Sequence, residues 1–365
     1  MGIRRSPLEG LVLSGFWSGK RVLVTGHTGF KGAWLSLMLA QQGASLRGLS
    51  LAPEPEGLFA AAGLEDLVPG GICDLRDRRA MEHAIGDFGP QVVFHLAAQP
   101  LVRQSYADPC ETWDTNLTGT LNLLELLRST GGPMTVVVIT TDKVYAPSDP
   151  PVPFCESDTL GGLDPYSASK AAVELLVNSH RKSFLEPLGI SLVTARAGNV
   201  IGGGDWAGNR IIPDILRAIS AGRPLHLRYP DAVRPWQHVL DPLAGYMLLA
   251  ERLASGSAAP LPPALNFGPG PDTDKTVAEL VEAARRAYAE VDLTVTADPE
   301  TAGNWPETDR LSLSVALAEK SLGWAPRWGF EESVEQTMQW YRRVQLGESP
   351  RAVTLDQIEA FEAAA

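Results

Sequence analysis

A glycine-rich turn near the amino end of the chain constrains the fold more than any other feature. Arg21–Val24 is a short, β-branched apolar run of the kind that forms a buried parallel strand. Gly26, Gly29 and Gly32 follow it at GxxGxxG spacing, and residues 33–41 show a helical pattern. In this arrangement the first glycine allows a tight turn, the second lets a pyrophosphate approach the backbone, and the third lets helix and strand pack closely. Because the helix N-terminus also offers unpaired N–H groups and the positive end of a dipole, the turn predicts a dinucleotide-binding site.

Strand and helix patterns alternate through the first half of the chain. Strand patterns recur at 45–51, 91–98, 135–140 and 190–196, and helical patterns at 117–128 and 166–180. This alternation predicts an α/β fold with a doubly wound, parallel Rossmann-type sheet.

The amino-acid composition changes after residue 198, where glycine, proline, tryptophan and arginine become frequent between short helical patterns. We therefore expect a dinucleotide-binding Rossmann-type domain over 16–198. A smaller, mostly C-terminal substrate lobe is expected over 199–350, above the carboxyl ends of the strands where ligands bind. A segment near 264–270 is expected to return to the main sheet, and residues 1–15 and 351–365 to form terminal extensions.

Charge, hydropathy and cysteine content exclude several functions. The 365 residues carry a formal net charge of −12, whereas a nucleic-acid surface needs the opposite sign. No apolar run approaches the ~20 residues of a membrane-spanning helix, and the first residues lack the apolar core of a signal peptide. Cys73, Cys110 and Cys155 are odd in number and far apart, which favours neither a disulfide framework nor a metal site. We expect a cytoplasmic protein that binds no nucleic acid, membrane or metal.

Tyr166 and Lys170 lie four residues apart, on one face of a predicted helix. A lysine ammonium beside a phenol stabilises the phenolate and lowers its pKa from ~10. Tyr166 would then be a usable base near neutral pH. The same spacing also arises by chance on amphipathic helices. What favours a catalytic pair is its position after the strand that ends at Thr140.

Three polar residues, Thr141, Asp142 and Lys143, follow that strand directly. An adjacent acid and base suit an elimination, in which one group donates and the other accepts a proton. Charged dipeptides are also common in solvated loops. A free lysine, with a pKa of ~10.4, is a poor base unless burial or a neighbouring cation lowers its pKa. Lys143 is therefore either a base or an electrostatic stabiliser.

The end of the second strand bears on the choice between NAD and NADP. A carboxylate there would bond the ribose 2′-hydroxyl of NAD, and an arginine would favour NADP. This strand ends at Leu49-Ser50-Leu51, with Arg47 inside it and Glu54 beyond it, so the position alone does not separate the two cofactors. Asp74 follows a predicted third strand, where it either reaches the adenine amino group or is an ordinary loop aspartate.

Together, the glycine turn, the Asp142-Lys143 pair and the Tyr166–Lys170 spacing resemble the extended short-chain dehydrogenase/reductase superfamily and, within it, the CDP-glucose 4,6-dehydratase family. The resemblance covers about residues 16–270. It is carried by the strings VTGHTGFKG at 24–32, HLAAQPLVR at 95–103, TDK at 141–143, ARAGNVIGGGDW at 195–206 and RPWQHVL at 234–240. Related dTDP- and GDP-sugar dehydratases carry glutamate where this sequence has Lys143, so that lysine points to the cytidine branch.

The sequence departs from the family pattern at two places. Val144 stands where the family often has cysteine, and Asn304-Trp305-Pro306-Glu307 differs from the expected Trp-His-Glu pattern. The second departure puts any role for Glu307 in doubt.

The resemblance implies an enzyme that converts CDP-glucose to CDP-4-keto-6-deoxy-glucose and regenerates its cofactor, NAD. Tyr166 would take the proton of the sugar 4-hydroxyl while hydride leaves C4. Lys143 would then remove the C5 proton as Asp142 protonates the departing 6-hydroxyl, and hydride would return to C6. Thr141 is implied as a hydrogen-bond partner of the 4-hydroxyl, and Lys170 as the partner of the tyrosine.

The resemblance also implies binding residues along the whole cleft. For the cofactor they are Gly26, Thr28, Gly29, Phe30, Gly32, Asp74, Leu75, Leu96, Ala97, Ala98, Thr140, Tyr166 and Lys170. For the substrate they are Gln99, Arg103, Asn199, Arg210 and Arg234. Arginine suits phosphate because its planar fork bonds two oxygens, although any one of these arginines could instead form an ordinary surface ion pair.

Two rival functions share this fold. A sugar-nucleotide epimerase, or another dehydratase, would keep the tyrosine and lysine, but an epimerase needs no acid–base pair for elimination. A non-catalytic NAD-binding regulatory protein would usually have lost the tyrosine or the lysine, whereas both are present here.

A homodimer is expected. The amphipathic helices predicted at 117–128 and 166–180 can pair with their two-fold copies in a four-helix bundle, which buries apolar surface that a monomer would expose.

Overall fold

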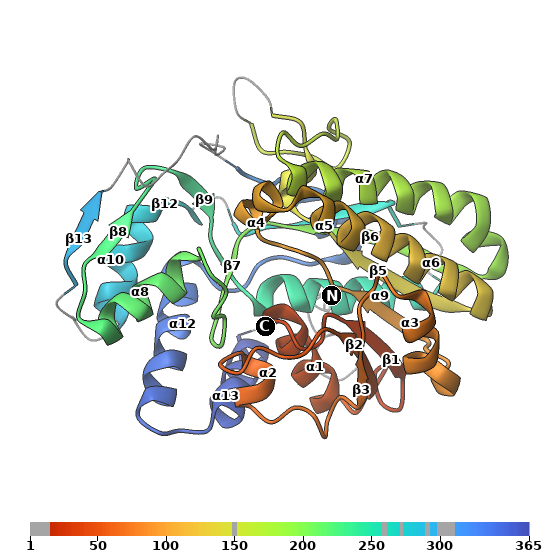
Figure 1. The fold of residues 1–365 in the computed structure, drawn as a ribbon, viewed down its shortest axis with the longest axis horizontal. Coiled ribbons are helices and arrows are strands. Elements are labelled where there is room, and N and C mark those ends of the chain that lie inside the picture. Colours follow the sequence, from red (N-terminus) through yellow and green to blue (C-terminus); the bar gives the residue numbers. More distant parts are fainter. Residues whose placement is uncertain are drawn as a thin grey trace, which may run out of the picture.

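A seven-stranded parallel sheet forms the centre of the protein, as the alternating pattern predicts (Figure 1). The structure is a computed structural model that describes residues 15–147, 152–256, 261–270, 273–288, 293–297 and 311–364. The strands are β1 (Arg21–Thr25), β2 (Ser45–Ser50), β3 (Gly70–Ile72), β4 (Val92–His95), β5 (Met134–Ile139), β6 (Ile190–Ala197) and β11 (Ala264–Phe267). Their spatial order is β11-β6-β5-β4-β1-β2-β3. The order reverses between β1 and β4, the kind of switch point at which open α/β sheets bind ligands.

Helices cover both faces of this sheet. On one face lie α1 (Phe30–Gln41) and α9 (Leu240–Ala254), and on the other lie α3 (Arg78–Ile85), α6 (Gly119–Thr130) and α7 (Pro165–His180). Side chains alternate between the two cores, so that Val22 and Val24 of β1 pack on one side and Leu23 on the other. Because both faces are covered, the central strands are largely apolar; β5, for example, is buried along its whole length.

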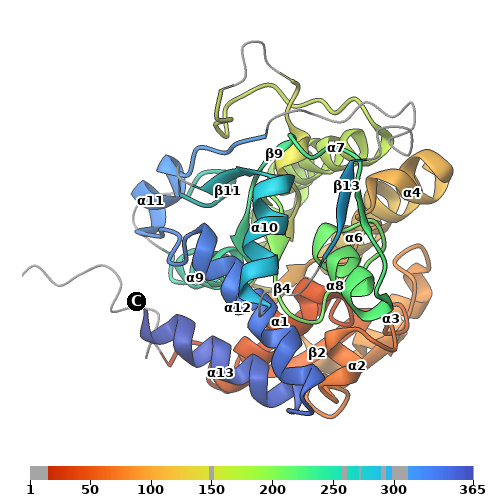
Figure 2. The same ribbon diagram turned by 90° about the vertical axis from the view of Figure 1, so that its left-hand side faces the viewer.

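A smaller lobe lies beside the carboxyl ends of the strands, at the left in Figure 1. Its main helices are α8 (Ile211–Ala221), α10 (Val277–Ala287) and α12 (Phe330–Gln345), and α10 packs on α12 (Figure 2). Short strand pairs complete it: β7 (Val200–Ile201) with β10 (Gln237–His238), β9 (Val233–Pro235) with β12 (Asp274–Thr276), and β8 (Leu225–Leu227) with β13 (Val295–Ala297). Four further short helices occur along the whole chain: α2 (Leu58–Ala61), α4 (Val102–Ala107), α5 (Pro109–Trp113) and α11 (Ala316–Leu322).

The chain passes between the two lobes more than once. Helix α9 and strand β11 come from the second half of the sequence but belong to the main layer, where Leu265 pairs with Ala195 of β6. A single cut at residue 199 therefore separates the two lobes only approximately.

The carboxyl-terminal residues form a packed helix rather than the expected extension. Helix α13 (Pro350–Ala363) lies against α12 and α1, with Val353, Ile358 and Phe361 buried (Figure 2). The Trp340 indole Nε1 donates to Thr354 Oγ1 at 2.9 Å, which joins the two helices. Residues 1–14 of the expected amino-terminal extension, and Glu307, lie outside the described residues.

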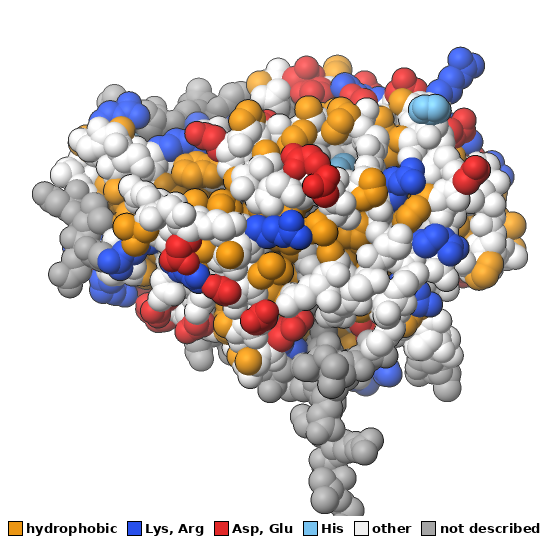
Figure 3. All heavy atoms as spheres, turned by 90° about the horizontal axis from the view of Figure 1, so that it is seen from below, with side chains coloured by type: hydrophobic (Ala, Val, Ile, Leu, Met, Phe, Trp, Pro, Cys, Tyr) orange, Lys and Arg blue, Asp and Glu red, His pale blue; other side chains and the backbone are white. Residues whose placement is uncertain are grey.

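Surface and composition add few constraints. On the face seen from below in Figure 3, acidic and basic side chains are interspersed rather than gathered by sign. None of the described helices is long and apolar enough to cross a membrane. Within the described ranges, no cluster of three or more His, Cys, Asp or Glu side chains could hold a metal. The cysteines are free.

Candidate active site

A cleft of about 1380 Å³ opens at the carboxyl ends of the strands, between the main sheet and the smaller lobe. Every cofactor, catalytic and substrate residue named from the sequence lines it. The glycine turn forms one part of the wall, the ends of β4 and β5 with the start of α7 form another, and the segment after β6 closes the third side.

The glycine turn is shaped by contacts that leave no room for side chains. A Cβ on Gly26, whose φ is +74°, would lie 2.7 Å from the Ala97 backbone nitrogen. A Cβ on Gly32 would lie 2.1 Å from the carbonyl oxygen of Gly26. Gly29 caps α1 and has no side chain to bond the first N–H groups of the helix, and these first residues line the cleft. These features fit the diphosphate of a dinucleotide.

Thr28 and Asp74 line the part of the cleft beside the ends of β2 and β3. The Thr28 hydroxyl lies 2.6 Å from Ser50 Oγ and donates to the Leu51 carbonyl oxygen at 3.0 Å, so it ties the turn to the end of β2. Asp74 accepts hydrogen bonds from Arg76 on both carboxylate oxygens, which lowers the pKa of Asp74. Asp74 thus lines the cleft as one member of an ion pair.

Tyr166 and Lys170 lie in the first two turns of α7, which Asp164 caps by accepting from Ser167 N at 2.9 Å, with Pro165 in the first turn. Burial raises the pKa of Tyr166 to about 12, and hydrogen bonding to Thr141 acts in the opposite direction. The Lys170 ammonium donates to the Ile139 carbonyl oxygen at 3.1 Å.

The high pKa of Tyr166 differs from the sequence expectation, in which the nearby lysine lowers it. Removing a phenol from water disfavours its ionised form, and burial is the largest effect here; the charges of Asp142 and Asp164 also raise the pKa, and the charge of Arg210 lowers it. Burial also lowers the pKa of Lys170, to about 8. Positive charge close to the phenol would favour its ionised form and so oppose the effect of burial.

Asp142 has one carboxylate oxygen engaged and one open. It begins a short 3-10 turn (Asp142–Val144) at the end of β5, and its side chain is 2% exposed. Oδ1 accepts from Thr141 Oγ1 at 2.9 Å, whereas Oδ2 has no hydrogen-bond partner among the described residues. The next residue, Lys143, is half-buried and lines the same cleft. The structure therefore brings the predicted acid–base pair beside Tyr166 and Thr141.

A buried glutamate, which sequence reasoning missed, supports this turn. Glu174 lies one helical turn beyond Lys170 and accepts from Thr140 Oγ1 at 2.5 Å, from Thr194 Oγ1 at 2.7 Å and from Arg196 Nη2 at 2.8 Å. It thereby joins β5, β6 and α7 behind the site. The Thr140 hydroxyl donates this bond and its backbone N–H donates to the Ala195 carbonyl oxygen, so Thr140 can offer only acceptor oxygens to the predicted cofactor contact. The spacing of four from Lys170 is the signal that sequence analysis could have used.

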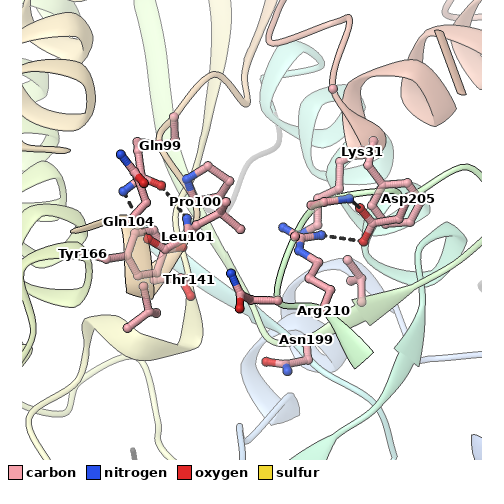
Figure 4. Close-up of a pocket in the computed structure, with 18 of the residues that line it drawn as sticks. Lys31, Gln99, Pro100, Leu101, Gln104, Thr141, Tyr166, Asn199, Asp205 and Arg210 are labelled. Atoms are coloured by element: carbon pink, nitrogen blue, oxygen red, sulfur yellow. Dashed lines mark hydrogen bonds and ion pairs between the residues drawn. The ribbon is translucent and has the colours of Figure 1, made fainter. Parts of the chain in front are cut away.

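The side-chain amide of Gln99 is used within its own loop (Figure 4). Its Oε1 accepts from Leu101 N at 2.6 Å, and its Nε2 donates to the Leu101 carbonyl and to Thr112 Oγ1. Asn116, which was also missed, accepts from Gln99 N and donates to Ser169 Oγ of α7. Asn116 lies in a π-helical turn (Asp114–Thr118), a feature common at functional sites. Gln99 therefore positions the loop, and its predicted contact with substrate stays a prediction.

Cationic side chains gather on the side of the cleft formed by the smaller lobe. Arg210 donates from Nη1 to Asp205 Oδ2 at 2.8 Å, and Arg234 is buried with Nη1 donating to the Val233 carbonyl. Arg103, on α4, and Asn199, after β6, also face the cleft. Lys31, in the first turn of α1, points toward Arg210 (Figure 4), and sequence analysis gave it no role.

Three buried histidines are structural. Burial lowers the pKa of His27 to about 4 and those of His95 and His238 to about 3, so all are neutral at pH 7. His95 sits between the hydroxyls of Thr25 and Thr120, at 2.7 and 2.9 Å.

Comparisons with known proteins agree with this geometry. The model of the family described as "NAD dependent epimerase/dehydratase family" matches residues 22–268. A CDP-glucose 4,6-dehydratase of Salmonella typhimurium is 44% identical over 340 residues, which cover 91% of this chain and 93% of that protein. A dTDP-glucose 4,6-dehydratase of Streptomyces griseus is 28% identical, covering 88% of this chain and 94% of its own.

A solved structure shows the same fold. The UDP-glucose 4-epimerase of Thermus thermophilus, in complex with NAD, superposes with a TM-score of 0.73 at 28% identity, over 88% of this chain and 99% of its own. The fold, the cleft and these matches agree with the predicted resemblance to the extended short-chain dehydrogenases/reductases. The chain belongs to the NAD-dependent epimerase/dehydratase family.

Proposed function

We propose that the protein is an NAD-dependent CDP-glucose 4,6-dehydratase, which forms CDP-4-keto-6-deoxy-glucose. One observation carries the proposal: Asp142, whose buried Oδ2 has no hydrogen-bond partner in the described part of the chain, adjoins Lys143 on the turn beside Tyr166. An epimerase oxidises and reduces the same carbon and has no use for such a pair. The 44% identity to a CDP-glucose 4,6-dehydratase over nearly the whole chain supports the cytidine substrate.

The oxidation half of the reaction uses the start of α7. NAD, when bound, supplies the hydride acceptor for C4 and the hydride donor for C6. Tyr166 takes the proton of the 4-hydroxyl, and Thr141, which is hydrogen-bonded to Tyr166, orients that hydroxyl. Lys170, held on the Ile139 carbonyl, supplies positive charge that stabilises the phenolate once the site is filled.

The elimination half uses the turn after β5. Asp142 donates a proton to the departing 6-hydroxyl through Oδ2, while Thr141 holds Oδ1. Two roles fit Lys143: it removes the C5 proton, or it stabilises the negative charge that develops next to the C4 ketone. Arg210, Arg234, Arg103 and Asn199 are the proposed contacts of the diphosphate and ribose.

The first prediction concerns the substrate. Purified enzyme with NAD should convert CDP-glucose to a product 18 mass units lighter, as loss of water requires, and should convert UDP-, dTDP- and GDP-glucose more slowly by about tenfold or more, a discrimination of ~1.4 kcal/mol. Mass spectrometry of the quenched mixtures measures this. Equal turnover of all four nucleotides would contradict the cytidine assignment, and epimerised product without loss of water would contradict the reaction.

The second prediction separates oxidation from elimination. Asp142→Asn keeps the size of the side chain but removes the acid, so loss of water should slow by ~10²–10⁴-fold while oxidation at C4 continues. Reduced nicotinamide and a 4-keto sugar that still carries its 6-hydroxyl should then accumulate. Single-turnover absorbance, with mass analysis of the sugar, measures both.

Tyr166→Phe is the matched control for this experiment, because it removes the base for oxidation and leaves Asp142 in place. It should give neither reduced nicotinamide nor product at an appreciable rate. Normal turnover by Asp142→Asn, without reduced nicotinamide, would show that Asp142 is not the acid.

We also propose that the protein is a homodimer that pairs α6 and α7 with their two-fold copies. Helices α5, α6 and α7 lie side by side on one surface (Figure 1). Large apolar side chains are exposed there: Leu175 is 63% exposed and Phe184 is 46% exposed. A four-helix bundle would remove this apolar area from water.

The third prediction tests this interface. Light scattering at micromolar concentration should give the mass of two 39.2-kDa chains, and Leu175→Glu should shift the mass to one chain. Leu346→Glu is the control and should leave the dimer intact, because Leu346 lies after α12 and is 76% exposed. A monomeric wild type would contradict the proposal.

A further inference from the structure

Lys31 is the one charged residue in helix α1, whose sequence is otherwise FGAWLSLMLAQ. Its neighbours in the helix are buried in the core, but Lys31 itself is half-buried and lines the cleft. From this placement we infer that Lys31 is a substrate-binding residue, whose ammonium group acts with the Arg210 guanidinium to hold the diphosphate of the nucleotide sugar. The inference rests on the proposed class of substrate.

Lys31 lines the same cleft as Arg210, Lys170 and Asp142. Besides burial, the charges of Arg210 and Lys170 lower the pKa of its ammonium group, and the charge of Asp142 raises it. Figure 4 shows Lys31 and Arg210 together on the side of the cleft that faces Thr141 and Tyr166. A sugar that presents its 4-hydroxyl to Tyr166 carries its diphosphate at the other end of the ring, on the Lys31 and Arg210 side.

The charge of Lys31 is poorly compensated within the chain. Arg210 is matched by Asp205 at 2.8 Å, whereas Lys31 takes part in none of the ion pairs formed by the described residues. Burial, followed by the charge of Arg210, lowers the pKa of Lys31 to about 8. A half-buried ammonium beside a guanidinium is electrostatically costly, and an anion placed between them removes that cost.

The cofactor diphosphate is the rival anion, because it is expected at the amino end of the same helix. There, however, the backbone N–H groups after Gly29 already provide the donors, and the turn is shaped so that backbone alone makes the contact. The Lys31 side chain leaves that turn and enters the field of Arg210 and Asp142. Substrate and cofactor would thus be held by the same helix, one through its side chain and one through its backbone.

The test is calorimetric titration of three ligands into Lys31→Met. Methionine keeps the length of the side chain and its helix propensity but removes the charge. With NAD-loaded enzyme, the affinity for CDP should fall by about 10- to 100-fold, as expected for the loss of one charge-assisted contact. The affinity for cytidine, which lacks phosphate, should stay within about twofold, and so should the affinity of the free enzyme for NAD. Lys31→Arg should restore most of the affinity for CDP.

The matched control is Lys182→Met, which removes an exposed lysine remote from the cleft and should change none of the three affinities. A loss of NAD affinity with CDP affinity retained would overturn the inference and make Lys31 a cofactor contact. Equal losses for CDP and cytidine, or a large fall in melting temperature, would overturn it in favour of a structural role.

Failure of the proposed function gives a different result. It appears in the wild type as turnover of another nucleotide glucose, and the same titration with that nucleoside diphosphate then tests Lys31. Unchanged affinity of Lys31→Met for the diphosphate of the nucleotide sugar that the wild type uses would contradict the inference directly.

Discussion

The close approach of the glycine turn to its neighbours is the constraint on which the rest of the site depends. A Cβ at Gly32 would lie 2.1 Å from the Gly26 carbonyl oxygen, and one at Gly26 would meet the backbone at Ala97. These contacts draw the start of α1 against β1 and the end of β4, beside the switch point of the sheet. The amino end of α1, which is the positive end of the helix dipole, and the polar side chains after β5 then line one cleft, so cofactor and substrate can meet there.

A second constraint lies behind the cleft, where charges are buried together. Glu174 and Arg196 are almost fully buried and 2.8 Å apart, and such a pair contributes little net stability because both groups lose water. The role of this ion pair is to fix the positions of the elements around it. Glu174 holds the end of β5 and the middle of α7 at fixed positions, and Arg196 continues the network through Tyr145 to Asn266 of β11. The turn that carries Asp142 is therefore supported from three strands and a helix.

Local sequence signals predicted the features that depend on local physics. The glycine spacing, the apolar strands and the residues that follow β5 all appear where the pattern placed them, because period, turn chemistry and strand ends are encoded within short windows. Features that depend on distant partners were missed. Helix α13 packs on α12 and α1, which are distant from it or from each other in the sequence, and the surroundings of Glu174 and Lys31 are likewise set by residues far along the chain. The high pKa of Tyr166 arises from burial, which no spacing of residues reveals.

The central claim is that one cleft oxidises C4 and then reduces C6 of the same sugar, and an isotope label tests it most directly. CDP-glucose deuterated at C4 is mixed with CDP-glucose that carries carbon-13 throughout the sugar and no deuterium, and the products are analysed by mass spectrometry and NMR. The account predicts deuterium at C6 of the molecules that began with it, and none in the carbon-13 product. Deuterium retained at C4, lost to solvent, or transferred to the carbon-13 product would contradict it.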